Sequence, residues 1–279
     1  MYTFEEEQRE VLEEEQDNVF EDMHDDVYQE ALALAQKKRK KKRRRKNYLL
    51  RLLVLVILGV GAYYGLTSSF FDVQEITVEN NRHYTVQQII HMTDARIGQN
   101  IFSTQTTQMR DALLADPYIR NARVIRSLPS SIIISVEERS EAAIVPYAGT
   151  FIVIDKAGIV LRRTNAQLEL PMLMGLTVRA MDEGSPLEVE ETGALTGTLQ
   201  ILETMAYTDT FFLKIDVSSF IVRAYIFENL ICEGTVENVM ASMANGRLEK
   251  LLYELYTNGV ERGIIYVGGD NYYSFNPMR

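Results

Sequence analysis

Few residues of this 279-residue chain are of the types that carry out catalysis. His83 and His91 are the histidines that follow its long apolar segment, and no Ser, Cys or Asp motif is placed to pair with either of them. A histidine without such a partner is more often a surface residue or a hydrogen-bonded core residue than a proton shuttle. We therefore interpret both histidines as structural.

The sequence does not indicate a cofactor or metal site either. No Cys and His residues stand at the spacing of a zinc site, and Gly268-Gly269-Asp270 predicts a turn between two apolar runs rather than a phosphate loop. Carboxylates gather at Glu137-Glu138 and in the segment 188–191, which we interpret as solvated faces. These features predict a binding protein without a cofactor, and an enzyme with an unrecognised site is the alternative.

A basic run followed by an apolar segment predicts a membrane anchor. Ten consecutive Lys and Arg residues, Lys37 to Lys46, precede a stretch from Leu52 to Phe71 that contains no charged residue. Twenty helical residues rise about 30 Å, the thickness of a bilayer's hydrocarbon core, and flanking basic residues stay on the cytoplasmic side. We expect a cytoplasmic tail at 1–46, a transmembrane helix at 47–69 and an outer part at 70–279. A cleaved signal peptide is the alternative.

Charge is divided unevenly along the chain. The first thirty residues hold 13 acidic residues and one Arg, so the inner tail is an acidic, solvated segment that ends in the basic run. From residue 67 onward there are 17 Lys and Arg against 26 Asp and Glu, a net charge of −9. Such a surface does not suit nucleic acid or anionic lipid, so contact with lipid is expected through the apolar helix. Cys232 is the single cysteine and is expected to be a buried apolar residue, with a reactive thiol as the alternative.

The first outer segment, residues 70–138, has the pattern strand, helix, helix, strand, strand. Thr85 is placed as the N-cap of a helix over Val86–Met92, and Asp116-Pro117 ends a second helix, because Pro cannot continue one. Alternating apolar residues predict strands at 73–78, 119–126 and 132–138. This order places two helices on one face of a small sheet.

Several short motifs in this segment follow one another in a family-specific order. They are Phe71-Asp72-Val73, Ile97-Gly98-Gln99-Asn100-Ile101-Phe102, Asp116-Pro117-Tyr118-Ile119, Leu128-Pro129 and Val136-Glu137-Glu138-Arg139. Their spacing just outside a single anchor helix resembles the polypeptide-transport-associated (POTRA) domain of the bacterial division protein FtsQ, called DivIB in Gram-positive bacteria. Glu79, where the family often has Gly, and Glu141, where it often has Pro, depart from that pattern.

Residues 139–279 predict a mixed β-sheet domain with helices. Phe151–Ile154 and Ile159–Leu161 form a predicted hairpin around an Asp-Lys-Ala-Gly turn. Helices are expected over Thr192–Tyr207 and, as one element, from Thr235 to Asn258. Further strands are expected at 211–217, 220–227, 263–267 and 271–275.

The predicted hairpin and the Leu-Pro-Met-Leu-Met-Gly segment at 170–175 are similar to the β-domain of the same family. The resemblance therefore covers most of residues 50–276. It implies an α+β chain with a single transmembrane helix, a POTRA domain (β-α-α-β-β) at 70–138 and a mixed β-sheet domain at 139–279.

The last predicted strand can act through backbone chemistry. A strand at a sheet edge offers unpaired N–H and C=O groups to an incoming strand. On the residues alone, Tyr272, Tyr273 and Phe275 could equally cap the faces of the sheet. In the family this strand receives a strand from FtsB or its Gram-positive counterpart DivIC. The resemblance places the partner contact at Val267, Asn271, Tyr272, Tyr273, Ser274 and Phe275.

The resemblance implies a non-enzymatic septal scaffold of the bacterial division machinery. It implies a single-pass protein of the cell membrane with a cytoplasmic N-terminus and an outer C-terminal domain. The implied partners are DivIC/FtsB-like and FtsL-like single-pass division proteins. A membrane-tethered cell-wall enzyme is one alternative, and a POTRA-bearing chaperone or secretion component is another. The latter usually ends in an outer-membrane barrel, whose series of alternating strands this sequence does not show.

Overall fold

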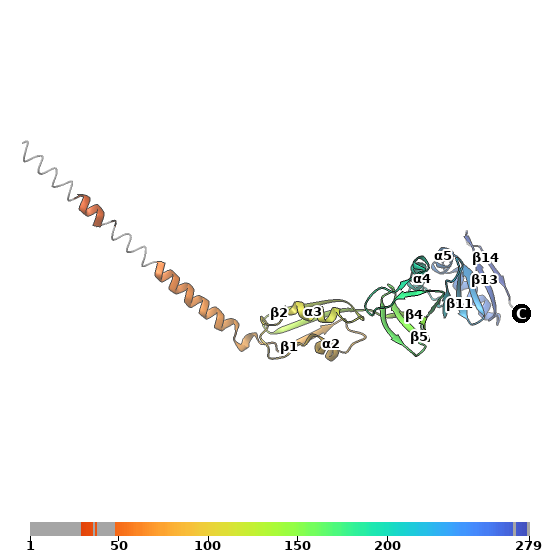
Figure 1. The fold of residues 1–279 in the computed structure, drawn as a ribbon, viewed down its shortest axis with the longest axis horizontal. Helices are drawn as coiled ribbons and strands as arrows, with labels where there is room; N and C mark the ends of the chain where they lie inside the picture. The colour runs from red at the N-terminus through yellow and green to blue at the C-terminus, as the bar shows by residue number, and fades with distance from the viewer. Residues whose placement is uncertain (1–28, 36, 38–47, 270–271, 278–279) are drawn as a thin grey trace, which may run out of the picture. The chain divides into compact units, whose positions relative to one another are not determined.

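The computed structural model describes residues 29–35, 37, 48–269 and 272–277. The chain divides into two compact units, Met1–Ser68 and Ser69–Arg279. In the first unit, the helix Tyr48–Leu66 is the one helix of the described residues that is long and apolar enough to cross a membrane (Figure 1). Its 19 residues rise about 28 Å, close to the thickness of a hydrocarbon core.

The second unit begins with a three-stranded sheet covered by two helices. After the short 3₁₀ helix η1 (Ser69–Phe71), the elements are β1 (Glu75–Glu79), α2 (Val86–Thr93), α3 (Thr106–Leu114), β2 (Ile119–Ser127) and β3 (Ser131–Glu138). The strand order is β1-β3-β2, with β1 parallel and β2 antiparallel to β3. This arrangement is the predicted β-α-α-β-β order.

Local sequence determines where these helices begin and end. The Thr85 hydroxyl accepts a hydrogen bond from the backbone N–H of Gln88, and the Gln88 side chain accepts one from the Thr85 N–H. This capping box satisfies two N–H groups that the first turn of α2 leaves unpaired. Helix α3 ends before Asp116-Pro117, as predicted. Ile89, Met109 and Leu113 of the two helices are buried against β3 side chains of one parity, Ile132, Ile134 and Val136.

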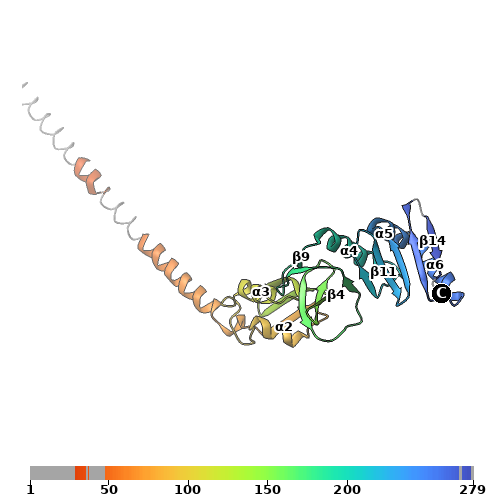
Figure 2. The same cartoon turned by 45° about the vertical axis from the view of Figure 1, so that its right-hand side comes forward.

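A nine-stranded mixed sheet makes up the rest of the second unit (Figures 1 and 2). Its order is β14 (Tyr273–Asn276), β13 (Gly263–Val267), β12 (Leu230–Gly234), β11 (Val222–Phe227), β10 (Lys214–Asp216), β7 (Met172–Met174), β4 (Glu141–Tyr147), β5 (Thr150–Asp155) and β6 (Val160–Thr164). A single residue pair, Ile144 with Met172, joins β4 to β7. Two short strands, β8 (Val178–Ala180) and β9 (Glu188–Val189), pair separately.

Three helices complete the hydrophobic core of this sheet. They are α4 (Thr192–Met205), α5 (Val236–Ala244) and α6 (Arg247–Thr257). Their buried side chains Ile201, Val239 and Leu248 belong to one cluster with Ile215, Cys232 and Ile265 of the strands. Burial raises the pKa of the Cys232 thiol to about 12, so this cysteine is an apolar core residue.

The structure corrects one prediction about the helices. The sequence pattern predicted one helix from Thr235 to Asn258, whereas α5 ends at Ala244 and α6 begins at Arg247. Gly246 between them has a φ of 67°, a left-handed conformation that a helix interior does not contain. The two apolar faces can therefore turn independently toward the core. Strands β4, β7, β8, β9 and β12 were not predicted.

The glycine of the Leu-Pro-Met-Leu-Met-Gly segment is required by close backbone packing. Gly175 has a φ of 83°, and a Cβ atom at this position would lie 2.3 Å from the backbone nitrogen of Ser218. No side chain fits that space without moving the backbone. The segment therefore holds the end of β7 against the end of β10.

Candidate docking edge

The nine-stranded sheet has two edges, and they differ in how they are covered. Beside β6, the segment 184–187 forms backbone hydrogen bonds: Val160 N–H donates to the Ser185 carbonyl, and Gly184 N–H donates to the Val160 carbonyl. At the other edge, no described residue donates to or accepts from the outward-facing side of β14. The β14 edge is therefore the open template for another strand.

The register of the last hairpin determines which groups face outward. Pairs in an antiparallel ladder alternate between those that exchange hydrogen bonds and those that do not. The Gly268 N–H donates to the Tyr272 carbonyl at 2.9 Å, which makes these two residues a bonded pair. Counting along β14, Ser274 and Asn276 bond to β13, whereas the N–H and C=O groups of Tyr273 and Phe275 point away from the sheet.

The side chains of β14 anchor the strand to the domain. Tyr273 and Phe275 are half-buried against the hydrophobic core. A Cβ atom added to Gly263 would lie 2.4 Å from the Phe275 ring, so this ring packs directly over the backbone of β13. The rings of Tyr273 and Phe275 cover one face of the sheet, while the backbone N–H and C=O groups of the same residues face outward at its edge. Capping the sheet and pairing with a partner strand, the two interpretations left open by the sequence, are therefore compatible.

The other residues of the predicted contact lie in different environments. Tyr272 is 64% exposed beside the turn. Val267 lies one strand inward, paired with Tyr273 and 5% exposed, so its side chain supports β14 instead of reaching a partner. Asn271 lies outside the described residues.

A polar cluster that the sequence did not reveal joins the two sheets of the second unit. The Glu141 carboxylate accepts hydrogen bonds from the Tyr118 hydroxyl at 2.7 Å and from Arg162 Nε at 2.7 Å. The His83 ring stacks on Tyr118 with the ring centroids 4.1 Å apart. Nearby, Arg139 pairs with the buried Asp155 at 2.8 Å. These contacts connect the three-stranded sheet to β4 and β6.

Electrostatics in this cluster favour the charged carboxylate. Burial alone would raise the pKa of Glu141, but hydrogen bonds from Arg162 and Tyr118, together with the Arg162 charge, lower it below its usual value. Burial, followed by the hydrogen bond to Glu141, raises the pKa of the Tyr118 hydroxyl to about 12. The phenol therefore stays protonated and acts as a hydrogen-bond donor.

Comparison with known proteins shows which proteins this chain resembles. Residues 71–139 match the family model described as POTRA domain, FtsQ-type. The chain is 30% identical over 135 residues to cell division protein FtsQ of Syntrophotalea carbinolica, covering 47% of this chain and 48% of that protein. It is 32% identical over 112 residues to cell division protein DivIB of Clostridium acetobutylicum, covering 39% and 45%. Residues 71–139 therefore match an FtsQ-type POTRA domain, and the chain is similar to FtsQ and DivIB cell division proteins.

The family match is partial in length. The matching segments span about half the length of the curated FtsQ and DivIB relatives. A DivIB of Clostridium botulinum is 25% identical over 184 residues, which is 64% of this chain and 72% of that protein. These relatives are named cell division proteins, and the helix Tyr48–Leu66 fits a single-pass anchor.

The two positions that depart from the FtsQ/DivIB pattern have partners in the structure. Glu79 at the end of β1 accepts a hydrogen bond from the Ser135 hydroxyl at 2.9 Å. Glu141, where the family often has Pro, is the centre of the polar cluster with Tyr118 and Arg162. The unusual residue at 141 was the signal in the sequence that could have indicated this cluster.

Proposed function

We propose that this chain is a non-enzymatic scaffold that binds other single-pass division proteins outside the membrane. The observation that supports this proposal most is that one edge of the nine-stranded sheet is covered and the other is open. The segment 184–187 pairs with β6, whereas the edge of β14 faces outward with its side chains already anchored. Such an edge can bind a partner strand with little loss of conformational entropy, because β14 is already folded before binding.

The partners in this proposal are a DivIC/FtsB-like protein and an FtsL-like protein. Similarity to FtsQ and DivIB cell division proteins supports this proposal, together with the cytoplasmic N-terminus and the septal location that the resemblance implies. The incoming strand would take its hydrogen bonds from Tyr273 and Phe275, and Tyr272 and Ser274 would contact its side chains. Val267 would support the edge from the neighbouring strand. The resemblance also places Asn271 in the contact, and this residue lies outside the described part of the chain.

A pair of substitutions at Tyr273 separates backbone from side-chain effects. Tyr273→Ala removes the half-buried ring and keeps the outward N–H, whereas Tyr273→Pro removes both. We expect Tyr273→Pro to bind the DivIC-like protein of the same organism roughly tenfold more weakly than Tyr273→Ala does, because one hydrogen bond is lost and the proline ring blocks the approach. The measurement is biolayer interferometry with the full-length chain in detergent.

Phe220→Ala is the matched aromatic control. Phe220 is 87% exposed in the β10–β11 turn, away from the edge strand, and its loss should leave partner binding unchanged. Circular dichroism shows whether each variant stays folded. Equal affinity of folded Tyr273→Pro and Tyr273→Ala for the partner would rule out β14 as the docking edge.

A further inference from the structure

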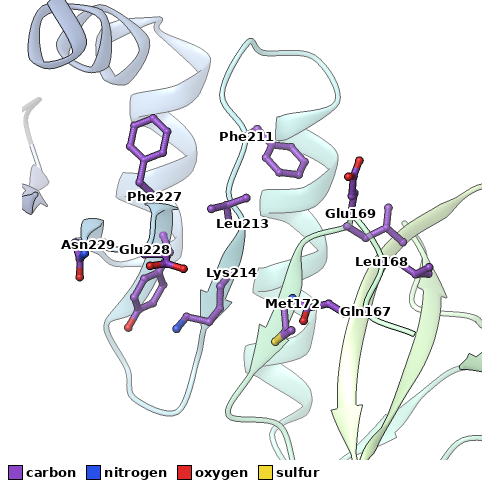
Figure 3. Close-up of a pocket in the computed structure, with 12 residues that line it drawn as sticks. Gln167, Leu168, Glu169, Met172, Phe211, Leu213, Lys214, Phe227, Glu228 and Asn229 are labelled. Carbon is purple, nitrogen blue, oxygen red and sulfur yellow. The ribbon is translucent and has the colours of Figure 1, made fainter. Parts of the chain in front are cut away.

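A second surface of the β-domain lies around the turn between β11 and β12. Two hollows of about 1130 Å³ and about 240 Å³ adjoin there, and Phe227 lines both of them. Phe211 and Leu213, which precede β10, line the larger hollow together with Phe227 (Figure 3). Tyr253 and Tyr256 of α6 line the smaller hollow. We call these five residues the aromatic patch.

The aromatic patch is unusually exposed for its composition. Phe211 is 51% exposed, Leu213 48% and Phe227 44%, and the two tyrosines of α6 are each at least 70% exposed. Single apolar side chains on a surface are ordinary, but several gathered around two adjoining hollows mark an interaction site.

A β-bulge creates the position of Phe227. The pairing of β11 with β12 shifts register between Tyr225 and Phe227, so Ile226 is an extra residue on β11. Bulges redirect side chains next to functional sites. Here the bulge places Ile226 in the smaller hollow and Phe227 at the boundary of both hollows.

The charges around the aromatic patch are mainly acidic. Glu169 and Glu228 line the larger hollow, and Asp209 and Glu249 line the smaller one. Within the described part of the chain, none of these four carboxylates forms an ion pair. Lys214 is the basic residue among the residues that line the two hollows, and its Nζ lies 3.8 Å from the centroid of the Tyr225 ring.

This combination selects for positive charge. Aromatic faces attract ammonium and guanidinium groups, and Lys214 over Tyr225 is an instance of that contact in the larger hollow. Neighbouring carboxylates add attraction for the same groups. The apolar residues between them would bury the aliphatic stems of Lys or Arg side chains.

We propose that the aromatic patch docks a basic amphipathic segment of a partner protein. The apolar residues of that segment occupy the larger hollow, and one of its Lys or Arg side chains enters the smaller hollow between Tyr253 and Phe227 toward Asp209 and Glu249. The contact uses side chains, so it is distinct from strand addition at β14. A second copy of this chain and an anionic membrane are disfavoured occupants, because each brings negative charge to a surface that is already acidic.

The probe is a fluorescent synthetic peptide of three Leu-Lys-Lys-Leu repeats, titrated with the full-length chain in zwitterionic nanodiscs. Empty nanodiscs give the lipid background. We expect saturable binding above that background that weakens as salt rises. A matched peptide with Glu in place of Lys should not bind. Phe227→Ala should weaken binding about fivefold or more, because aromatic residues dominate such contacts, and Asp209→Asn with Glu249→Gln should weaken it by a smaller factor.

Two controls keep the outcome specific. Phe220→Ala removes an exposed aromatic residue outside the aromatic patch and should bind the peptide normally. Tyr273→Pro should also bind it normally, so failure here and failure at the β14 edge are distinguishable. The proposal is overturned if the acidic peptide binds as well as the basic one. It is also overturned if Phe227→Ala binds the basic peptide with unchanged affinity. Concentration-dependent self-association of the full-length chain that Phe227→Ala abolishes would overturn it as well.

Discussion

Glu141 shows how one residue outside the family pattern is accommodated. Its side chain is 26% exposed, and it holds together a phenol from the first sheet and a guanidinium from β6. A carboxylate in this position is stabilised because two donors are directed at it and one of them is charged. A proline could make neither contact. The local chemistry of the connection therefore differs from that of relatives with proline at this position.

This arrangement predicts an acid-sensitive contribution to stability. Because the pKa of Glu141 is lowered in the folded state, its contribution is present above the unfolded value of about 4.3 and is lost as the pH falls through the folded value. At neutral pH, Glu141→Gln should lower the free energy of unfolding by about 1 kcal/mol, a figure that allows for partial exposure. The difference from the wild type should shrink below about pH 4.3.

Chemical denaturation at several pH values measures this difference. The matched control is Glu137→Gln, whose carboxylate pairs with Arg120 on the surface, with both side chains more than half exposed. That substitution should change stability by less than about 0.5 kcal/mol at any pH. A pH-independent loss in Glu141→Gln would mean that packing, not charge, holds the cluster.

At the scale of elements, the sequence predicted features that depend on neighbouring residues, such as helix ends. It did not predict strands that depend on pairing with distant segments. Thr85 begins a helix, and Asp116-Pro117 and Asn258 end helices, as predicted, because caps depend on neighbouring residues alone. The single helix predicted after Thr235 was wrong, because apolar periodicity hid the left-handed Gly246. Strand β12 is short, and its pairing with β11 on one side and, across α5 and α6, with β13 on the other identifies it.

The candidate sites differ in the same way. The terminal hairpin is local, so the edge strand could be proposed from its sequence. The aromatic patch combines the segment before β10, a bulge in β11 and one face of α6. The sequence alone does not predict this patch, because its residues come from distant segments that meet only in the folded sheet.

The ladder of the last hairpin predicts a pattern of amide protection. Ser274 and Asn276 donate to β13, whereas the N–H groups of Tyr273 and Phe275 face outward. In the free protein, hydrogen exchange measured by NMR should be slow at the first two residues and fast at the other two, because exposed donors exchange without opening of the ladder. Addition of the DivIC-like partner should slow Tyr273 and Phe275 selectively. Slow exchange of all four amide hydrogens before the partner is added would contradict the proposal that the edge of β14 is unpaired.

At the scale of the whole molecule, the charge distribution predicts the orientation of the chain across the membrane. The ten basic residues at 37–46 stand immediately before the apolar helix Tyr48–Leu66, and the residues that follow it are net acidic. Basic residues resist transfer across the membrane, so the C-terminal unit is expected outside. Both proposed docking surfaces depend on this orientation, since each lies in the unit Ser69–Arg279.

Topology reporters test that expectation directly. Alkaline phosphatase, which folds to an active form only outside the cytoplasm, should be active when fused after Arg279 and inactive when fused before Met1. A variant with several of the residues Lys37 to Lys46 replaced by Gln should show mixed orientation, because the charge asymmetry across the helix is reduced. The matched control is Arg247→Gln, which removes a basic residue of α6, far along the chain from the apolar helix, and should keep the wild-type ratio of the two activities. Phosphatase activity at the N-terminal fusion alone would place both docking surfaces in the cytoplasm and exclude the proposed outer partners.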